Sequence, residues 1–240
     1  MTPGGPRLLQ PGEVAVAYLP LDETASHRAE EDLAVLSADE LARHARLPER
    51  GRIEFRSARA LLRRMLSRCS AEDPRAWRFS RSAEGKPEIT GASPDPGLVF
   101  NVSHTRGLVA CAVARGASVG IDVEWNGRSR RYEALAARVL APGERQAMQS
   151  LAESDRIPRF LDYWTLKEAH LKASGTGLRV SPAALEFRLL GEQGARCLAS
   201  PDPETATWHY LRLTPTPNHH LAVAFTGRHE PRWNVLSPCP

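Results

Sequence analysis

The sequence predicts an α/β (α+β) fold of two pseudo-symmetric halves, each a small antiparallel sheet packed with helices, with the functional site in the cleft between them. Two observations predict it. Strand-like and helix-like segments follow one another in the same order in each half of the 240-residue chain. The segment HLAVAF near the end also echoes LVACAVA near Ala110, which we interpret as an internal duplication. We expect the halves to span residues 1–117 and 118–240.

In the first half, Ser37 followed by two acids predicts the start of a helix that reaches about Leu47. Pro48 can open the next helix, because proline is tolerated in a first turn, and apolar residues at helical spacing extend that helix to about Arg68. Segments rich in Gly and Pro, at 85–87 and 91–97, are expected to be loops. Strands are expected at Glu13–Leu19, Trp77–Ser80, Leu98–Ser103 and Leu108–Ala114.

The second half repeats this order. A strand is expected at Val119–Trp125, where apolar and acidic residues alternate. Helices are then expected at Tyr132–Leu140, Pro142–Leu151 and Pro158–Ser174, and strands at Leu185–Leu190, Trp208–Leu213 and His220–Phe225. Glu144 is interpreted first as an acid in the first turn of its helix.

Composition narrows the class of protein. The sequence contains no run of about 18 apolar residues and no apolar stretch behind a basic start, so we expect neither export nor membrane insertion. The four cysteines have neither metal-ligand spacing nor the density of a disulfide scaffold, which indicates reduced thiols in the cytoplasm.

Basic residues are concentrated between residues 41 and 81, which hold twelve arginines against four acids. Four of these arginines recur three and four residues apart and so form one stripe along the expected helix: Arg52, Arg56, Arg59 and Arg63. Such a stripe can bind a polyanion, or it can be an ordinary solvated helix face. Both interpretations stay open on the sequence alone.

Two acidic side chains stand out in Gly120-Ile-Asp-Val-Glu124. On a strand, Asp122 and Glu124 point to one face while the two apolar residues between and before them point to the other. Adjacent carboxylates repel one another unless a cation joins them, and magnesium prefers oxygen ligands of this kind. The alternative is a solvent-facing strand edge.

A helical motif supplies the possible partner. In Trp164-Thr-Leu-Lys-Glu-Ala-His-Leu-Lys172, Glu168 and Lys172 lie four residues apart on one helix face. Glu168 can then be a third metal ligand, and Lys172 can neutralise a phosphate oxygen or a leaving group. The alternative is an exposed Glu–Lys pair of little energetic value.

A third motif, Asn101-Val-Ser-His104, runs from a strand into a turn. Ser103 and His104 are adjacent, so a strand points them to opposite faces, which disfavours a Ser–His nucleophilic pair. Each can still donate a hydrogen bond to a phosphate.

Together these motifs and Gly85-Lys86-Pro87 resemble the 4'-phosphopantetheinyl transferases of the surfactin-synthetase-activating type, the two-halved and monomeric branch of that superfamily. The resemblance covers roughly residues 40 to 180. It implies an enzyme of the holo-[acyl-carrier-protein] synthase kind, which uses Mg²⁺, or Mn²⁺ as a substitute, to move the phosphopantetheine arm of coenzyme A onto a serine of an apo acyl or peptidyl carrier protein, releasing 3',5'-ADP.

The resemblance also implies roles for residues. Asp122, Glu124 and Glu168 would hold the metal, and Glu168 and Lys172 would be catalytic. Coenzyme A phosphates would be contacted by Arg43, Arg46, Arg59, Lys86, Ser103 and His104. Carrier proteins are generally acidic around the modified serine, so Arg128, Arg130 and Arg131 are hypothetical docking residues. The protein is expected to act in the cytoplasm as a monomer, with neither nucleic acid nor membrane as partner.

Two other classes compete with this interpretation. A metal-dependent nuclease also combines acids, a lysine and a basic helix, but such sites commonly place Glu and Lys two apart on a strand, whereas Glu168 and Lys172 are four apart in a helical segment. A basic nucleic-acid-binding module would explain the arginine stripe and leave the carboxylates unused.

Overall fold

The computed structural model describes residues 8–22, 24–82, 87–90, 95, 97–127, 132–201 and 207–236. The chain divides into two compact units. Unit 1 contains the residues up to Ala117 together with those from Arg232 onward, and unit 2 is Ser118–Pro231.

Unit 1 is a four-stranded sheet packed against a long helix, with a separate two-stranded hairpin. The sheet order is β11-β1-β5-β4, and β2 pairs with β3. The strands are β1 (Glu13–Pro20), β2 (Phe79–Arg81), β3 (Pro87–Ile89), β4 (Leu98–Thr105), β5 (Leu108–Arg115) and β11 (Arg232–Leu236). The helices are α1 (Thr24–His27), α2 (Ala29–Ala34), α3 (Ala38–Arg46) and α4 (Glu49–Ser70).

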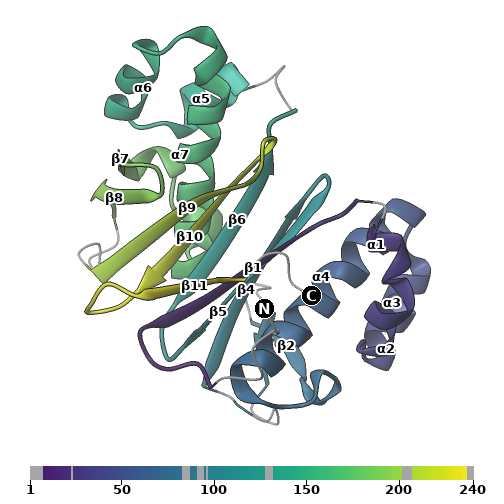
Figure 1. The fold of residues 1–240 in the computed structure, drawn as a ribbon. Helices are drawn as coiled ribbons and strands as arrows, with labels where there is room; N and C mark the ends of the chain where they lie inside the picture. Colours follow the sequence, from purple (N-terminus) through teal and green to yellow (C-terminus); the bar gives the residue numbers. More distant parts are fainter. Residues whose placement is uncertain are drawn as a thin grey trace. The chain divides into compact units, whose positions relative to one another are not determined.

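The core of unit 1 forms where α4 lies against the sheet (Figure 1). Leu62, Met65 and Leu66 of α4 are fully buried beside Val109 and Val113 of β5. Ser37 caps α3 by accepting a hydrogen bond from the Glu40 amide, while the Glu40 carboxylate accepts from the Ser37 amide. The helix start expected at Ser37 is therefore confirmed.

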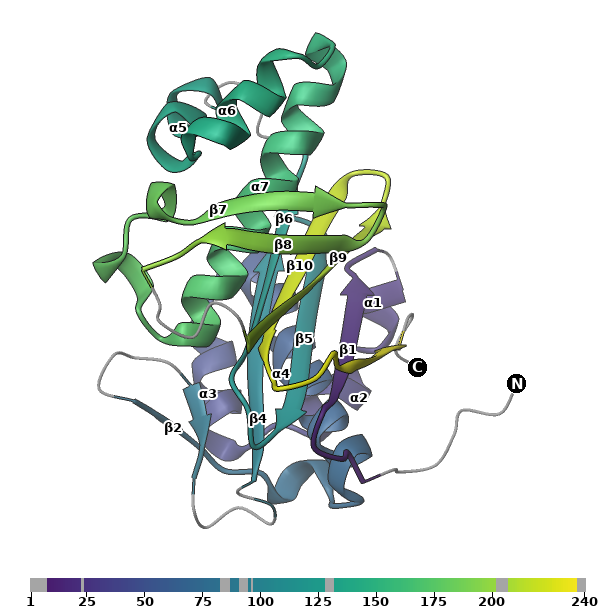
Figure 2. The ribbon, with the colours of Figure 1, turned by 90° about the vertical axis from the view of Figure 1, so that its left-hand side faces the viewer.

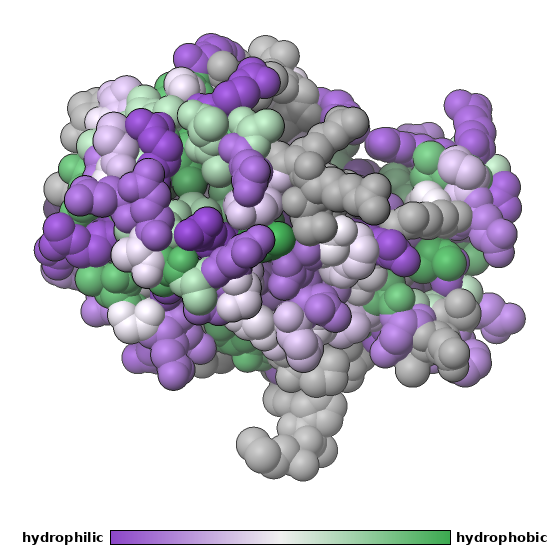
Figure 3. All heavy atoms as spheres, turned by 90° about the horizontal axis from the view of Figure 1, so that it is seen from above, coloured by the Kyte–Doolittle hydropathy of each residue, from purple (hydrophilic) through white to green (hydrophobic). Residues whose placement is uncertain are grey.

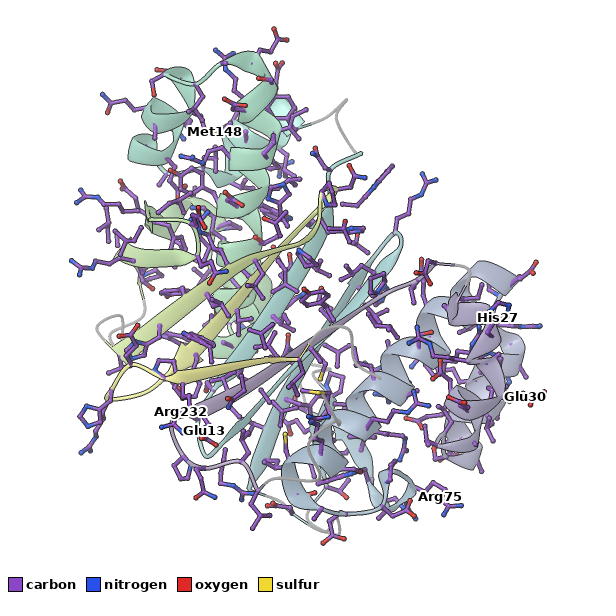
Figure 4. All side chains as sticks on the ribbon, in the orientation of Figure 1. Glu13, His27, Glu30, Arg75, Met148 and Arg232 are labelled. Atoms are coloured by element: carbon purple, nitrogen blue, oxygen red, sulfur yellow. The ribbon has the colours of Figure 1, made fainter. Side chains whose placement is uncertain are left out.

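One strand corrects the expected division of the chain. The second half was expected to continue to residue 240, but β11 pairs in parallel with β1 and so completes the sheet of unit 1. Arg232 lies beside Glu13 at the start of this pairing (Figure 4), with its Nη1 3.3 Å from Glu13 Oε1. Strand β11 thus follows unit 2 in sequence but belongs to unit 1, because the exposed edge of β1 offers it backbone hydrogen-bond partners.

Unit 2 is a five-stranded sheet in the order β6-β10-β9-β8-β7. Its strands are β6 (Val119–Trp125), β7 (Glu186–Leu190), β8 (Gly194–Ala199), β9 (Trp208–Thr216) and β10 (His219–Thr226), and its helices are α5 (Tyr132–Val139), α6 (Pro142–Gln149) and α7 (Glu153–Ser174). Helix α7 packs along β6 and β10 (Figure 1). The β7–β8 hairpin meets β9 at Gly194 and Ala195 and crosses the direction of the other strands (Figure 2).

The internal echo in the sequence corresponds to equivalent strands. LVACAVA lies in β5, which pairs antiparallel with β1, the first strand of unit 1. HLAVAF lies in β10, which pairs antiparallel with β6, the first strand of unit 2. In each unit a 22-residue helix, α4 or α7, packs on these strands. The expected α/β class with antiparallel sheets packed by helices is confirmed.

Other expectations need smaller corrections. Helix α7 begins at Glu153, five residues before the expected start at Pro158, and Pro158 lies inside it. The short elements α1, α2, β3, β8 and β11 were not expected.

No helix among the described residues is long and apolar enough to cross a lipid bilayer. Seen from above, hydrophobic residues form small separate patches among hydrophilic ones (Figure 3).

Half of the arginine stripe on α4 is buried rather than open to solvent. Arg63 is buried and donates to the Glu40 carboxylate and to the carbonyls of Pro74 and Trp77. Arg56 is also buried and donates to the Ala25 carbonyl. Helices α1 to α3, which pack beside α4, supply part of these partners, so half of the stripe stabilises unit 1.

Candidate active site

The acid pair expected on a strand lies on β6, one of the two edge strands of the unit 2 sheet. The register places Asp122 opposite Ala222 and Glu124 opposite His220 of β10. Residues directly opposite each other in an antiparallel pair share a face of the sheet. Ala222 belongs to the apolar core formed with α7, so Asp122 and Glu124 face α7.

Helix α7 comes unusually close to β6 at Gly120. A Cβ atom at this position would lie 2.1 Å from the Ala169 carbonyl oxygen and 2.6 Å from the Ala173 amide nitrogen. Any side chain would therefore collide with the helix backbone. The glycine of the strand motif thus permits the close packing that brings Glu168 and Lys172, the residues before these two alanines, to the acid pair.

Two hydrogen bonds join α7 to the acids. Lys172 Nζ lies 2.6 Å from Asp122 Oδ1 and also donates to the Ile121 carbonyl at 3.2 Å. Trp164 Nε1 donates to Glu124 Oε1 at 3.3 Å. The lysine expected to act on a phosphate thus forms an ion pair with Asp122.

Glu168 completes the acidic group. Burial raises the pKa of its carboxyl group, the negative charge of Asp122 and then of Glu124 raises it further, and Lys172 opposes the shift. The three carboxyl groups therefore lie within electrostatic range of one another, as the sequence motifs implied.

The donor set fits a hard divalent cation, since it consists of carboxylate oxygens that repel one another. In this conformation, however, the described residues contain no group of three or more His, Cys, Asp or Glu side chains arranged to hold a metal ion. The Lys172 ammonium stands beside Asp122 instead. The assignment of Asp122, Glu124 and Glu168 as metal ligands therefore remains a prediction.

The opposite face of α7 is structural. Lys167 is fully buried and its Nζ lies 2.8 Å from Glu144 Oε2, while it also donates to the carbonyls of Pro182 and Leu185. Glu144 accepts from the amides of Ala141 and Phe187. Glu144 is therefore the helix-start acid that we expected.

His170, also in the helical motif, faces this core. Its Nδ1 lies 2.8 Å from the Tyr210 hydroxyl oxygen, and its ring centroid is 4.5 Å from that of Trp208. The motif thus divides into residues that build the core and residues that face the acids of β6.

Unit 1 holds the side chains expected to bind phosphate. Arg43 and Arg46 are exposed on α3, and the Arg43 guanidinium lies 5.0 Å from the centre of the Phe55 ring. Arg59 already forms an ion pair within unit 1, because its Nε lies 3.0 Å from Glu40 Oε1. Burial lowers the pKa of the Arg59 guanidinium, and Glu40 opposes that shift.

Arg59 also lines a cavity of about 440 Å³. The wall includes cationic, acidic and aromatic side chains, namely Arg63, Arg75, Arg78, Glu40, Trp77 and Phe79. Among the described residues, Arg43 and Arg46 are not part of this wall.

Ser103 and His104 alternate as expected for a strand. Ser103 is buried and His104 is exposed on β4. His104 Nδ1 lies 3.9 Å from Glu54 Oε2 of α4. This alternation agrees with the interpretation that the two residues do not form a nucleophilic pair. Lys86 and the proposed docking residues Arg128, Arg130 and Arg131 lie outside the described residues.

Comparison with known proteins identifies the family. The family model of the 4'-phosphopantetheinyl transferase superfamily matches residues 118–224. The 4'-phosphopantetheinyl transferase HetI of Nostoc sp. is 35% identical over 217 residues, which covers 90% of this chain and 88% of HetI. The chain belongs to the 4'-phosphopantetheinyl transferase superfamily.

Other known proteins are similar to smaller parts of the chain. A 4'-phosphopantetheinyl transferase of Bacillus subtilis is 30% identical over 54% of this chain and 55% of its own length. The crystal structure of a holo-(acyl-carrier-protein) synthase from Bacillus anthracis in complex with CoA (3',5'-ADP) has 22% identity and a TM-score of 0.40, covering 45% of this chain and 94% of that one.

The resemblance inferred from the motifs is therefore confirmed. Members of the superfamily transfer the phosphopantetheine arm of coenzyme A to carrier proteins. The matched residues 118–224 include β6 and α7, so the acid pair, Glu168 and Lys172 lie within the part of the chain that defines the family. This membership does not favour the nuclease or the nucleic-acid-binding module.

Sequence reasoning missed one polar cluster in unit 2. Asp162 of α7 contacts His220 of β10 and Arg212 of β9. The three residues are far apart in sequence and share no motif, so no spacing rule could group them. The available signal was a histidine within the apolar run HLAVAF.

Proposed function

We propose that this protein is a magnesium-dependent 4'-phosphopantetheinyl transferase that modifies a serine of an apo acyl or peptidyl carrier protein and releases 3',5'-ADP. The observation that carries the proposal is the meeting of Asp122 and Glu124 on β6 with Glu168 and Lys172 on α7, in a chain of this superfamily.

Asp122, Glu124 and Glu168 are the proposed ligands of Mg²⁺, which supplies positive charge to the diphosphate of coenzyme A. Lys172 is then available to neutralise a phosphate oxygen as negative charge develops on the leaving 3',5'-ADP. The carrier serine must lose its proton as it attacks the β-phosphorus. Glu168 is our candidate for the acceptor, because it lies at the acid group that is proposed to bind the metal and the diphosphate.

The residues proposed to bind the phosphates of coenzyme A belong to unit 1. We propose that the cationic side chains Arg43, Arg46 and Arg59 contact the adenosine 3'-phosphate. Ser103, His104 and Lys86 are proposed to contact the other phosphates. Arg128, Arg130 and Arg131 are proposed to meet the acidic surface of the carrier protein. We further propose that the protein acts as a monomer in the cytoplasm.

The direct test is incubation with coenzyme A, Mg²⁺ and several apo carrier proteins. Intact mass spectrometry should detect an increase of about 340 Da, the mass of the transferred arm, on at least one carrier. A folded protein that leaves every carrier at its starting mass would refute the proposal.

A variant of the acid pair tests the site itself. Asp122→Asn should lower transfer about 100-fold or more, because it removes one charged ligand and the partner of Lys172. Asp95→Asn in unit 1, which loses an ion pair with Arg115, is the control and should keep near-normal transfer. Near-normal transfer by a folded Asp122→Asn protein would remove Asp122 from the site.

A further inference from the structure

Asp162 is held by two strands at once. Its Oδ1 lies 2.8 Å from His220 Nδ1 on β10, and its Oδ2 accepts from Arg212 Nη1 on β9 at 2.9 Å. His220 and Arg212 are each only 7% exposed. Both carboxylate oxygens of Asp162 are therefore engaged by nearly buried partners.

Arg212 is itself fixed to the backbone. Its Nη2 donates to the carbonyls of Gly191 and Glu192 at 2.8 and 2.9 Å, and its Nε donates to the Gly194 carbonyl at 3.2 Å. A guanidinium with this many partners has little freedom to move. Asp162, His220 and Arg212 thus form a rigid attachment, which we name the Asp162 anchor.

The anchor lies on the face of the sheet that carries the acid pair. His220 stands opposite Glu124 in the β6–β10 register. Arg212 stands opposite Ala222, which in turn stands opposite Asp122. Along α7, Asp162 comes two residues before Trp164, whose indole binds Glu124.

Helix α7 is therefore attached to the sheet on both sides of its site residues. Lys172 bonds to Asp122 at the C-terminal side, and the Asp162 anchor holds the N-terminal side. Trp164 and Glu168 lie between these two attachments, in the stretch that leads to the close approach at Gly120.

The two attachments differ in what happens during the reaction. The Lys172 attachment uses Asp122 and Lys172, which the proposed function assigns to the metal and to the phosphates, so it must open when those ligands bind. The Asp162 anchor uses no residue assigned to a ligand and can stay closed. Once substrate is bound, the anchor still fixes the N-terminal side of this part of α7, while the buried contact of His170 with Tyr210 of β9 remains nearer its C-terminal end.

We infer that the Asp162 anchor positions Trp164 and Glu168 against Glu124 and Asp122, and so sets metal affinity and turnover. Asp162 and His220 are positioning residues in this inference. They act through α7 and contact neither the serine oxygen nor the β-phosphorus of the proposed reaction. The inference rests on the proposed function.

The test compares two carboxylates of equal exposure. Asp162 and Asp95 are 20% and 19% exposed, and each is paired with an arginine, but Asp95 lies in unit 1. For Asp162→Asn, Asp95→Asn and the wild type, we would measure Mn²⁺ binding to the metal-free protein by electron paramagnetic resonance, thermal unfolding, and kcat and KM for coenzyme A. Asp162→Asn should weaken Mn²⁺ binding and lower kcat about tenfold each, with KM for coenzyme A changed less than about twofold.

Asp95→Asn should change thermal unfolding alone. Equal losses of Mn²⁺ affinity in both variants, or wild-type affinity and kcat in Asp162→Asn, would overturn the inference. If Asp162→Asn does not fold, His220→Asn and His220→Leu replace it. Asparagine retains a donor for Asp162 Oδ1 and should preserve Mn²⁺ affinity, whereas leucine should reduce it; equal affinities in the two would also overturn the inference.

The two proposals fail in different ways. A wild-type protein without transfer to any carrier refutes the proposed function. If the wild type transfers the arm normally and the variants of the Asp162 anchor match its Mn²⁺ affinity and kcat, only the inference about the anchor is refuted.

Discussion

Glu168 lies in a partly buried position near two other acids, Asp122 and Glu124, with one lysine close by. Burial is the largest cause of its raised pKa, the two acids add to the shift, and Lys172 opposes it. Ionised Glu168 is thus unfavourable in the metal-free protein, and a bound cation would relieve this repulsion.

Replacing Glu168 with Gln should separate stability from activity. Because the folded protein holds this proton more tightly than the unfolded chain, the wild type loses stability as the pH rises from the unfolded pKa through the raised folded pKa. Glu168→Gln lacks that loss, so at neutral pH without metal it should unfold about 2 °C higher, while transfer falls at least ~100-fold.

Thermal unfolding at acidic and neutral pH, in the absence of divalent ions, checks this prediction. The difference between variant and wild type should disappear at acidic pH, where Glu168 is protonated in both states. A Glu168→Gln protein that is less stable than the wild type at neutral pH would contradict it.

At the residue scale, local spacing predicted which side chains meet on α7 and β6, because period-two and period-3.6 rules act over a few residues. It gave no role to Lys167, the residue next to Glu168. Neighbouring helix residues point about 100° apart, and only the packing of α7 against Glu144 decides which is buried. The Asp162–His220 contact joins residues 58 apart in sequence, beyond any such rule.

At the scale of elements, the separation of α7 from β6 depends on the missing side chain of Gly120. A methyl group at this position would lie so close to Ala169 and Ala173 that no relaxation of side chains could relieve the clash, because the nearest atoms are backbone. The helix must shift if this position gains a Cβ.

Gly120→Ala should therefore destabilise the protein by about 1–3 kcal/mol, which lowers the unfolding temperature by roughly 3–10 °C. It should also lower kcat, since the shift falls on the turns that carry Glu168 and Lys172. Circular dichroism melting and the mass-based transfer assay measure both effects.

Gly51 of α4 provides the matched control. A Cβ there would meet its nearest atom at 3.6 Å, an ordinary contact, and alanine favours helix by up to ~1 kcal/mol over glycine. Gly51→Ala should keep both stability and transfer. If Gly120→Ala behaves the same way, the close approach does not constrain α7.

The long elements were predictable because their apolar periodicity is strong. Strand β6 was expected at its observed bounds, and α4 and β10 within two residues of theirs. The missed strands β8 and β11 are half-exposed, so alternation in them is weak. The role of the arginine stripe on α4 stayed open on the sequence, because helix α1, whose Ala25 carbonyl accepts from Arg56, gave no signal of its own and no spacing rule pairs Arg63 with Glu40 of α3.

At the scale of the whole molecule, unit 1 is discontinuous in sequence. Strand β11 covers the edge of β1, and Leu236 packs against the core of unit 1. An uncovered strand edge is a template for pairing with another chain.

Ending the chain after Pro231 should therefore make it self-associate in a concentration-dependent way and unfold at a lower temperature. Size-exclusion chromatography over a range of concentrations and thermal unfolding would show this. Arg232→Ala keeps the strand and removes an ion pair in which the arginine side chain is 70% exposed and the Glu13 side chain 7% exposed, so it should lower the unfolding temperature but leave the protein as monodisperse as the wild type. A truncated protein that stays monodisperse would contradict this role for β11.

The parallel pairing of β11 with β1 also fixes an order of events during translation. All of unit 2 is synthesised before the strand that finishes unit 1. At ordinary elongation rates the nascent first unit waits on the order of 10 s with an open sheet edge. Of the two units, the one that comes first in this sequence is thus the last to be completed.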